Sequence, residues 1–172
     1  MHIKIKGSLL CLMLLLSTIA ILSETSCSSL SAGPITIRAT VIPSVCVSTP
    51  ADIRIWELKP SGPGVYTKKG VIRVSANSRW KISVKNAGDI NDGHMIEWAG
   101  TTFSSRKTQA TLRVSADREV ALPDGGPIQT GTIADDQEVP VTLTQMVSQN
   151  DLPLEDGHVY RIALSFEGSP MD

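Results

Sequence analysis

Two histidines are the first candidates for chemistry in the 172-residue sequence. Beyond residue 32 only His94 and His158 occur, and each follows an Asp-Gly pair, in Asp92-Gly93-His94 and Asp156-Gly157-His158. Imidazole and carboxylate groups together can hold a transition metal. Asp-Gly, however, also forms a turn after which histidine begins the next strand, and histidines this far apart in sequence give no ligand spacing. The turn interpretation is favoured, and we expect no metal and no other cofactor.

An acidic loop, Ala87–Met95, is the second candidate because it partly matches a calcium-binding loop. Such loops place oxygen ligands at alternate positions and a glycine after the fifth. Asp89 and Asn91 fit the first and third positions, but Asp92 and Gly93 each come one residue early. The spacing therefore favours a solvated turn over a calcium site.

Groups for covalent or acid–base catalysis are poorly arranged in the sequence. No Gly-x-Ser-x-Gly turn exposes a nucleophile, and no glycine-rich loop leads into a helix where phosphate could bind. Two carboxylates could hydrolyse a glycoside. Nothing in the spacing marks a pair among the available acids, which are Glu97, Asp135, Asp136, Glu138, Glu155 and Asp156. We expect the protein not to be an enzyme.

Aromatic side chains are the remaining candidates, because exposed rings can stack on sugars. The chain holds three Trp, two Tyr and two Phe. Trp80, Tyr160 and Phe166 fall on apolar faces of predicted strands and are expected in the core. A strand buried on both faces would account for Trp56 without a ligand. The candidates for binding envelope glycans are therefore Trp56, Tyr66, Trp98 and Phe103.

The N-terminus has the layout of a secretory signal peptide. Lys4 and Lys6 precede an apolar run of 14 residues, Leu9–Leu22, which small polar residues follow. The run is shorter than the roughly 20 residues of a membrane-spanning helix. We expect residues 1–32 to be a signal peptide and residues 33–172 to form a single domain. The mature protein would then be secreted or lie at the outer cell surface, without inserting in the membrane.

The net charge argues against nucleic acid as a partner, and the cysteines leave the covalent state of the chain open. Removing Lys4, Lys6 and Glu24, which together carry +1, changes the formal net charge from −1 to −2. A nearly neutral chain lacks the basic surface of a nucleic-acid-binding protein. Cys27 could be acylated, but Glu24 stands where a lipoprotein signal has an aliphatic residue. Cys27 could also pair with Cys46, so the state of this cysteine stays open.

Short alternating segments with turn residues between them predict the elements that position these groups. Beyond the signal peptide no stretch keeps the helical spacing of apolar residues. The expected strands are Pro34–Val41, Val45–Ser48, Ile53–Leu58, Val71–Ala76, Trp80–Val84, His94–Trp98, Ala110–Ala116, Arg118–Leu122, Glu138–Val147 and His158–Phe166. About eight to ten short strands predict an all-β fold, an Ig-like sandwich of two antiparallel sheets, with a closed barrel as the alternative. Pro140 places the start of its strand at an edge or bulge.

The stretch Val71–Gly88 constrains the register of the sheets. Two apolar rows alternate with polar residues here, Ile72-Val74-Ala76 and Trp80-Ile82-Val84. A two-residue turn would set an apolar row against a polar one. A three-residue turn, Asn77–Arg79, would pair the two apolar rows, and a crossover between sheets would turn both into one core. Both alternatives point Trp80 inward, so we predict that its side chain is largely buried.

The order of several short motifs resembles a family of small secreted β-sandwich proteins of methanogenic archaea. The matching residues are Asn77, Trp80, Gly93, Met95, Gln145, Val147, Asp151, Gly157, Tyr160 and Arg161. The N-terminal half is also similar to spore-coat-U-type and pilin-like secreted domains. In those a cysteine like Cys46 pairs with one near the end of the strand that corresponds to Val71–Ala76, where this chain has Ser75 and Ala76. The resemblance implies a secreted β-sandwich and no catalytic residues.

These observations predict a secreted or cell-surface structural or interaction protein without catalytic activity. Its partners would be other cell-surface proteins, further copies of itself or envelope glycans. The alternatives are a carbohydrate-binding module and a pilin-like fibre subunit. A fibre subunit would leave a strand edge or groove open to a strand of a second copy, with Ser28–Pro34 as the candidate donor.

Overall fold

The computed structural model describes residues 37–87 and 92–171. From Thr40 onward these residues form one compact unit. Strands dominate it, in two antiparallel sheets, with one short α-helix and one 3-10 turn. This confirms the predicted all-β sandwich, and the described residues form eleven strands rather than eight to ten.

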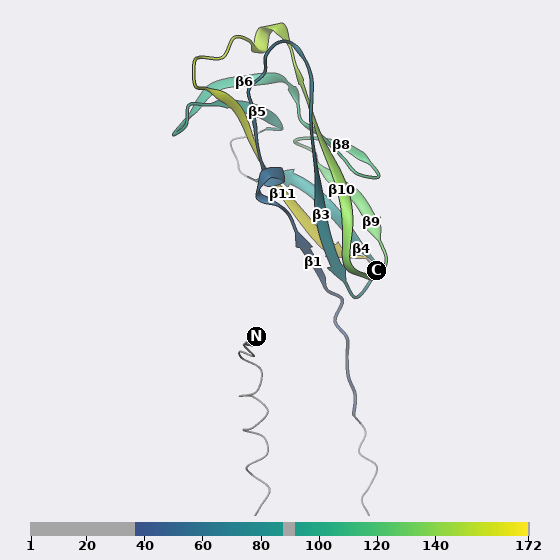
Figure 1. Cartoon of the computed structure of the whole chain (residues 1–172). Coiled ribbons are helices and arrows are strands. Elements are labelled where there is room, and N and C mark those ends of the chain that lie inside the picture. Colours follow the sequence, from purple (N-terminus) through teal and green to yellow (C-terminus); the bar gives the residue numbers. More distant parts are fainter. Residues whose placement is uncertain (1–36, 88–91, 172) are drawn as a thin grey trace, which may run out of the picture. The chain divides into compact units, whose positions relative to one another are not determined.

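The first sheet is built around two long strands that lie side by side (Figure 1). The strand order is β1 (Val45–Ser48), β3 (Gly64–Ala76), β10 (Ala134–Val147), β7 (Arg113–Ser115) and β8 (Glu119–Ala121). Alternate residues of β3 and β10 point into the core, as period-2 patterning requires. The predicted strands Val71–Ala76 and Glu138–Val147 are therefore the C-terminal parts of the longer strands β3 and β10.

The second sheet is organised around the last strand, β11 (Val159–Pro170). Its other members are β4 (Trp80–Asn86), β5 (His94–Trp98), β6 (Phe103–Thr111), β9 (Gly126–Gly131) and β2 (Ile55–Leu58). Strands β4 and β5 follow each other along one side of β11, and β2 pairs with the opposite side. Ala163 of β11 shows this arrangement, because Ile55 pairs with it while the Ala87 N–H donates to its carbonyl at 3.0 Å.

The core lies between the inner faces of the two sheets. Trp80, Tyr160 and Ile72 are fully buried in it, and the surrounding side chains are mostly Val, Ile and Leu. The prediction that Trp80 is largely buried is confirmed, because none of its surface is exposed. Every buried residue of the described part of the chain lies between Ile53 and Leu164, so the core that these residues form belongs to the unit that begins at Thr40.

The turn before Trp80 carries the chain from one sheet to the other. Strand β3 belongs to the first sheet and β4 to the second, so their apolar rows face each other across the core. The crossover alternative is therefore the one found. The three-residue hairpin pairing of Ala76 with Trp80 does not form, because β3 pairs with β1 and β10 while β4 pairs with β11 and β9.

Three of the predicted strands differ in the structure. Predicted strand Ala110–Ala116 is divided at Leu112, because Ala110 and Thr111 end β6 of the second sheet and Arg113–Ser115 form β7 of the first. Residues 37–44, which include most of predicted strand Pro34–Val41, form no strand, and residues 34–36 lie outside the described part. Predicted strand Ile53–Leu58 opens with a helical turn, α1 (Ala51–Arg54), and only its last four residues form β2. The helical turn allows Ile53 to enter the core, where it packs against Gly70 of β3.

Pro140 lies in β10, which is a central strand, but the position has an edge-like environment. Pro140 pairs with Val71 of β3, whereas β7 pairs with β10 only from Thr142 to Thr144. The ladder with β3 also breaks between Ala134 and Gln137. This register shift, three to six residues before Pro140, is the bulge that the sequence predicts. Pro140 itself loses no ladder bond to β7, because β7 does not pair with it.

Candidate functional site

The C-terminal half of β11 has one unpaired side. From Leu164 to Pro170 this strand pairs with β4 on one side. On the opposite side, β2 stops at Ala163, and no strand among the described residues continues the ladder. We call the unpaired side of Leu164–Pro170 the β11 edge. A row of free backbone groups of this kind is a ready template for another strand.

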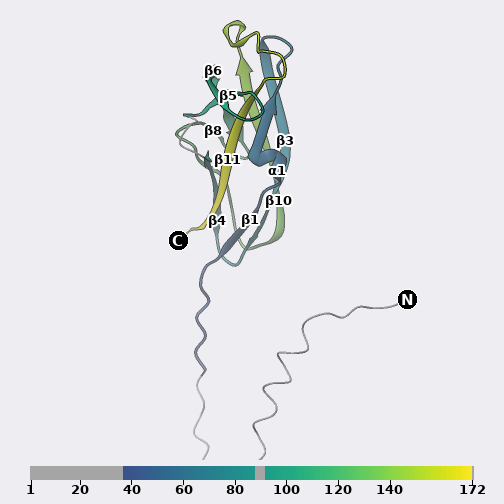
Figure 2. The ribbon, with the colours of Figure 1, turned by 90° about the vertical axis from the view of Figure 1, so that its left-hand side faces the viewer.

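The neighbouring strand β1 lies beside the β11 edge without pairing to it. In both ribbon views the lower part of β11 runs between β1 and β4 (Figure 1, Figure 2). β1 forms its ladder with β3, and its side chains Val45 and Val47 pack on Gly168 of β11. The helical turn α1 separates β1 from β2, so the chain changes sheets before it can pair with the lower half of β11.

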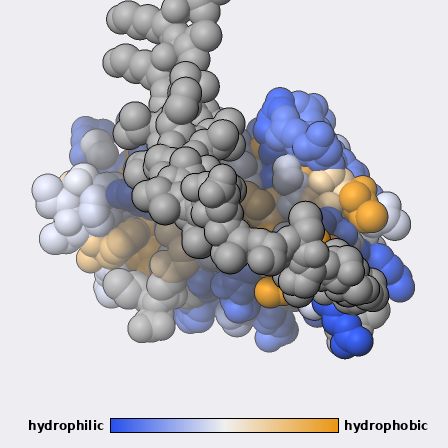
Figure 3. All heavy atoms as spheres, turned by 90° about the horizontal axis from the view of Figure 1, so that it is seen from below, coloured by the Kyte–Doolittle hydropathy of each residue, from blue (hydrophilic) through white to orange (hydrophobic). Residues whose placement is uncertain are grey.

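Two hollows lie beside Leu164, where the β11 edge begins. One of about 350 Å³ is lined by Val47, Thr49, Arg54, Ala87, Leu164, Ser165 and Phe166. A second of about 270 Å³ shares Arg54, Ala87 and Leu164 with it. Val47 and Phe166 are only half-buried and pack against the margin of the core. On the part of this face that is not drawn in grey, apolar groups lie among polar ones (Figure 3).

The chain that leads into β1 is apolar and exposed. We call residues Ile37–Pro43 the leading segment. Ile37, Val41 and Ile42 are 86%, 76% and 77% exposed, which is unusual for large aliphatic side chains. The side chain of Asn77 ties the end of this segment to the β3–β4 turn. Its amide donates to the Ile42 carbonyl at 3.0 Å, and its oxygen accepts from the Ser44 N–H at 2.8 Å.

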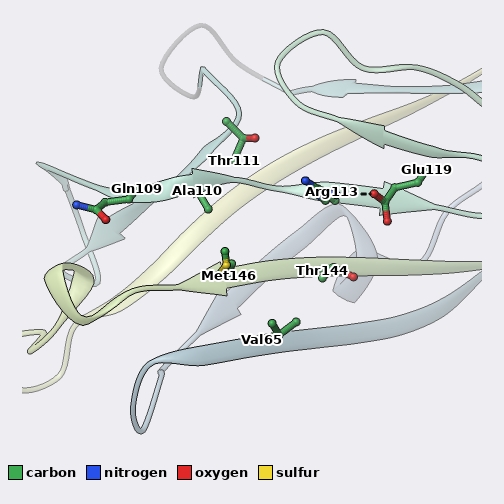
Figure 4. Close-up of a pocket in the computed structure, with 8 residues that line it drawn as sticks. All are labelled: Val65, Gln109, Ala110, Thr111, Arg113, Glu119, Thr144 and Met146. Atoms are coloured by element: carbon green, nitrogen blue, oxygen red, sulfur yellow. Dashed lines mark hydrogen bonds and ion pairs between the residues drawn. The ribbon is translucent and has the colours of Figure 1, made fainter.

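A different hollow, of about 510 Å³, opens where β6 leaves β10 (Figure 4). Val65 and Met146 project from β3 and β10, and the Arg113–Glu119 ion pair closes one end at 2.8 Å. Below it the buried Gln145 amide donates to the carbonyls of Ala110 and Met146, both at 2.9 Å. The Gln145 side chain thus bonds to β6 where no backbone ladder joins β6 to β10. The hollow lies there because the chain leaves the second sheet after β6 and enters the first sheet with β7.

The two candidate histidines have separate environments. His94 Nδ1 lies 2.7 Å from the Thr108 carbonyl, whereas His158 Nδ1 lies 3.0 Å from Glu97. Among residues 37–87 and 92–171, no group of three metal-ligating side chains is found. Asp89 and Asn91 of the predicted calcium loop lie outside the described residues, and Asp92 forms an ion pair with Lys107 at 2.8 Å.

The pair His158–Glu97 is the closest approach to a catalytic arrangement. Glu97 is buried and also accepts a hydrogen bond from the Ser104 hydroxyl at 3.0 Å. Burial raises the pKa of the Glu97 carboxyl, but the hydrogen bonds from His158 and Ser104 outweigh it and leave the pKa below its usual value. Serine and histidine thus both contact the carboxylate. In a nucleophilic triad the histidine would stand between the other two groups.

The remaining acids have structural contacts or lie at the surface. Asp136 and Glu138 both form ion pairs with Arg73 across β10 and β3. Glu155 lies 3.7 Å from His158 Nε2 and is strongly exposed. Asp135 and Asp156 are exposed. The structure therefore brings Glu97, Glu155 and His158 together, and leaves the other candidates apart from them.

The candidate aromatics offer no flat open platform. Trp56 is buried in the core, at 5% exposure. The Tyr66 hydroxyl donates to the Gly62 carbonyl at 2.8 Å and accepts from the Ser61 and Gly62 N–H groups. Trp98 is half-buried, with Phe103 tilted by 56° against it and the Arg161 guanidinium 4.6 Å from its ring centre. These rings serve packing and cation–π contacts.

Asp151 and Tyr160, two of the residues that carry the family resemblance, have clear structural roles. Asp151 is buried, and its carboxylate accepts from the N–H groups of Gln109 at 2.9 Å and Ser148 at 2.6 Å. The Tyr160 hydroxyl donates to the Asp151 carbonyl at 2.7 Å, and burial raises the pKa of Tyr160. This network fastens β6, the turn η1 (Gln149–Asp151) and β11 to one another.

Cys46 lies on β1 with its side chain exposed, and it has no disulfide partner among the described residues. Its direct neighbour in the ladder is Ser75 of β3. Cys27, its alternative partner, lies outside the described part of the chain.

Comparison with models of known families, with characterised proteins and with solved structures finds no match to this chain. Within the described residues, no helix has the length and apolar character needed to cross a membrane.

Proposed function

We propose that the protein is a non-catalytic structural or interaction protein of the cell surface, which associates with copies of itself through a strand edge. The observation that carries this proposal is the β11 edge, whose backbone groups are open over Leu164–Pro170. The exposed leading segment adds apolar groups that have no place in the described sandwich. The signal-like run Leu9–Leu22 supports an extracellular location.

The contacts of the other candidates also support a role without catalysis. The nearest approach to catalytic groups places Glu97 between Ser104 and His158, an order that suits a structural tie. The geometry gives no specific support for sugar binding, because Trp56 is buried and Trp98 is covered by Phe103 and Arg161.

The test is the mass of residues 33–172 in solution, which retain the whole core. We expect sedimentation velocity to show dimers or longer assemblies that grow from micromolar to millimolar protein. In the same range a chain beginning at Ser44 should stay monomeric. A chain of residues 33–172 that remains monomeric throughout would contradict the proposal.

A further inference from the structure

We propose that the β11 edge binds the leading segment of a second copy as an added antiparallel strand, with Val41 opposite Leu164 and Ile37 opposite Gly168. This inference rests on the proposed self-association and specifies its partner, its strand and its register.

The direction of the β11 backbone shows which groups are free. The Ala163 carbonyl accepts from Ala87 N–H, and Met171 N–H donates to the Arg79 carbonyl, so both residues point toward β4. Since β11 and β4 pair without a register shift, the odd-numbered residues between them point the same way. The even-numbered residues Leu164, Phe166 and Gly168 therefore direct their backbone groups to the open side.

Pro170 sets the lower limit of the β11 edge. It has an even number, so its missing N–H would have faced the open side, where no ladder bond of the described residues is lost. The upper limit is Ala163, where β2 occupies the same side. An incoming strand thus has room for about five residues opposite Leu164–Gly168, a length of about 17 Å.

The side chains of the leading segment complement this edge. Its apolar residues Ile37, Ala39 and Val41 alternate with Arg38 and Thr40, so they share one face of a strand. On the inner face of β11, Leu164 and Phe166 are followed by Gly168, which has no side chain. The antiparallel register sets small Ala39 opposite Phe166 and Ile37 opposite Gly168. Val45 and Val47 of β1 fill the space of the missing Gly168 side chain, so Ile37 would pack beside these two valines.

The outer faces of the two strands also match. In this register Arg38 lies opposite Glu167, and cross-strand pairs of opposite charge stabilise a sheet. Glu167 is exposed and already pairs with Lys85 at 2.6 Å, so Arg38 would add a second cation. Beyond Val41, the 350 Å³ hollow beside Leu164 has room for the side chain of Ile42. The pairing ends at Val41, because β2 occupies this side of β11 from Ala163 onward.

Asn77 explains why the segment comes from a second copy. To reach its own β11 edge, the leading segment would have to reverse its direction between Ile42 and Ser44. The Asn77 side chain holds both of these residues against the β3–β4 turn. The direction of a folded-back segment would also be parallel to β11, which would lose the pairings of Ala39 with Phe166 and of Arg38 with Glu167.

Disulfide trapping between two differently tagged preparations of residues 33–172 tests the register. Both carry Cys46→Ser to remove the exposed native thiol. One carries Thr40→Cys and the other Ser165→Cys, which the proposal places directly opposite each other as a non-hydrogen-bonded pair. Their Cα separation of about 4.5 Å lies within the range that a disulfide spans. We expect mild oxidation to give a disulfide-linked heterodimer of the two tags.

The matched control replaces Ser165→Cys by Ser169→Cys, four residues further along the same edge and too far from Thr40 in this register. It should trap at least tenfold less heterodimer, since about 13 Å separates the two positions. Equal trapping at both positions would overturn the register. A disulfide formed within one chain that carries Thr40→Cys and Ser165→Cys, but not between chains, would overturn the second-copy assignment.

A second measurement compares charges on the two faces of the leading segment. Val41→Asp places a carboxylate on the inner face and should weaken self-association at least tenfold, because a buried unpaired charge is costly. Thr40→Asp places it on the outer face and should change the dissociation constant about twofold or less. The register and partner fail if the protein self-associates but the disulfide between positions 40 and 165 does not form and the Val41→Asp and Thr40→Asp variants associate equally well. The proposed function would still stand in that case. If residues 33–172 are monomeric, both fail.

Discussion

Trp80 and Gly131 form one tightly packed unit at the scale of single residues. Trp80 is fully buried, and Gly131 of β9 is its ladder partner. A Cβ atom at position 131 would overlap the indole ring. The glycine is required here by the close approach of a side chain, and its backbone does not adopt positive φ.

Gly131→Ala should therefore destabilise the protein, by about 1–3 kcal/mol, which is typical of overpacking in a core. The measurement is urea-induced unfolding followed by tryptophan fluorescence. Gly62→Ala is the control, because a Cβ at Gly62 meets no atom within 4 Å. Adding Trp80→Phe to Gly131→Ala should show a favourable coupling energy, and additive effects would argue against the overlap.

Several side chains could be placed from the sequence by parity alone. Trp80, Tyr160 and Phe166 were predicted to lie in the core. Trp80 and Tyr160 are fully buried, whereas Phe166 is half-buried and packs against the margin of the core. Trp56 could not be placed in the same way. The helical turn before β2 reverses the parity there, so that Trp56 is buried while Ile55 is 40% exposed.

At the scale of elements, Glu97 connects three strands through its carboxylate. It lies in β5, accepts from Ser104 of β6 and contacts His158, the residue before β11. Burial raises its pKa, but the hydrogen bonds from His158 and Ser104 lower it further than burial raises it. The folded state thus holds the proton of Glu97 more weakly than the unfolded state, where the pKa is about 4.3.

This pKa difference gives a pH dependence with a defined sign. A carboxyl with a depressed pKa adds stability above its unfolded value, and this is lost as the pH falls through the folded value. Between roughly pH 6 and pH 3, thermal unfolding of the wild type should therefore lose more stability than that of Glu97→Gln. Glu155→Gln, at a strongly exposed position, should follow the wild type. Parallel curves for wild type and Glu97→Gln would contradict the role of this carboxylate.

Strands with a strict apolar alternation were the most predictable. β4 and β11 follow the alternation and lie where the sequence indicates, and β5 was also predicted, although its adjacent residues Met95 and Ile96 are both buried. β9 and the first half of β6 were missed, because Gly126–Gly131 contains proline and glycine and Phe103–Gln109 is almost wholly polar. Both lie at the margin of the second sheet, where one apolar face is not needed.

The β11 edge itself could not be read from the sequence. Whether a strand has two neighbours depends on which sheet each distant segment joins, and local pattern does not carry that information. The sequence predicted Val45–Ser48 and Ile53–Leu58 as strands, but not that the first joins β3 and the second β11. The candidate donor named from the sequence, Ser28–Pro34, lies outside the described residues, and the exposed apolar residues found here follow it.

At the scale of the whole molecule, the sandwich is complete without the leading segment. Among residues 37–87 and 92–171, all buried residues lie between Ile53 and Leu164, and Ile37–Pro43 are exposed. A chain that begins at Ser44 should therefore unfold with nearly the same free energy as one that begins at Gly33, within about 0.5 kcal/mol. Urea titration at sub-micromolar protein measures this difference without contributions from self-association. A loss of several kcal/mol would show that the segment belongs to the core.

The two ends of the sandwich are fastened to the same turn, and this has a mechanical consequence. Asn77 holds Ser44 at 2.8 Å, and the Arg79 carbonyl accepts from Met171 N–H at 2.8 Å. In the proposed assembly, tension would enter a subunit through the lower half of β11 and leave it through the leading segment. The load path would cross only this turn and the strands beside it. The greater part of the core would then carry no force, so a filament could be stretched without unfolding its subunits.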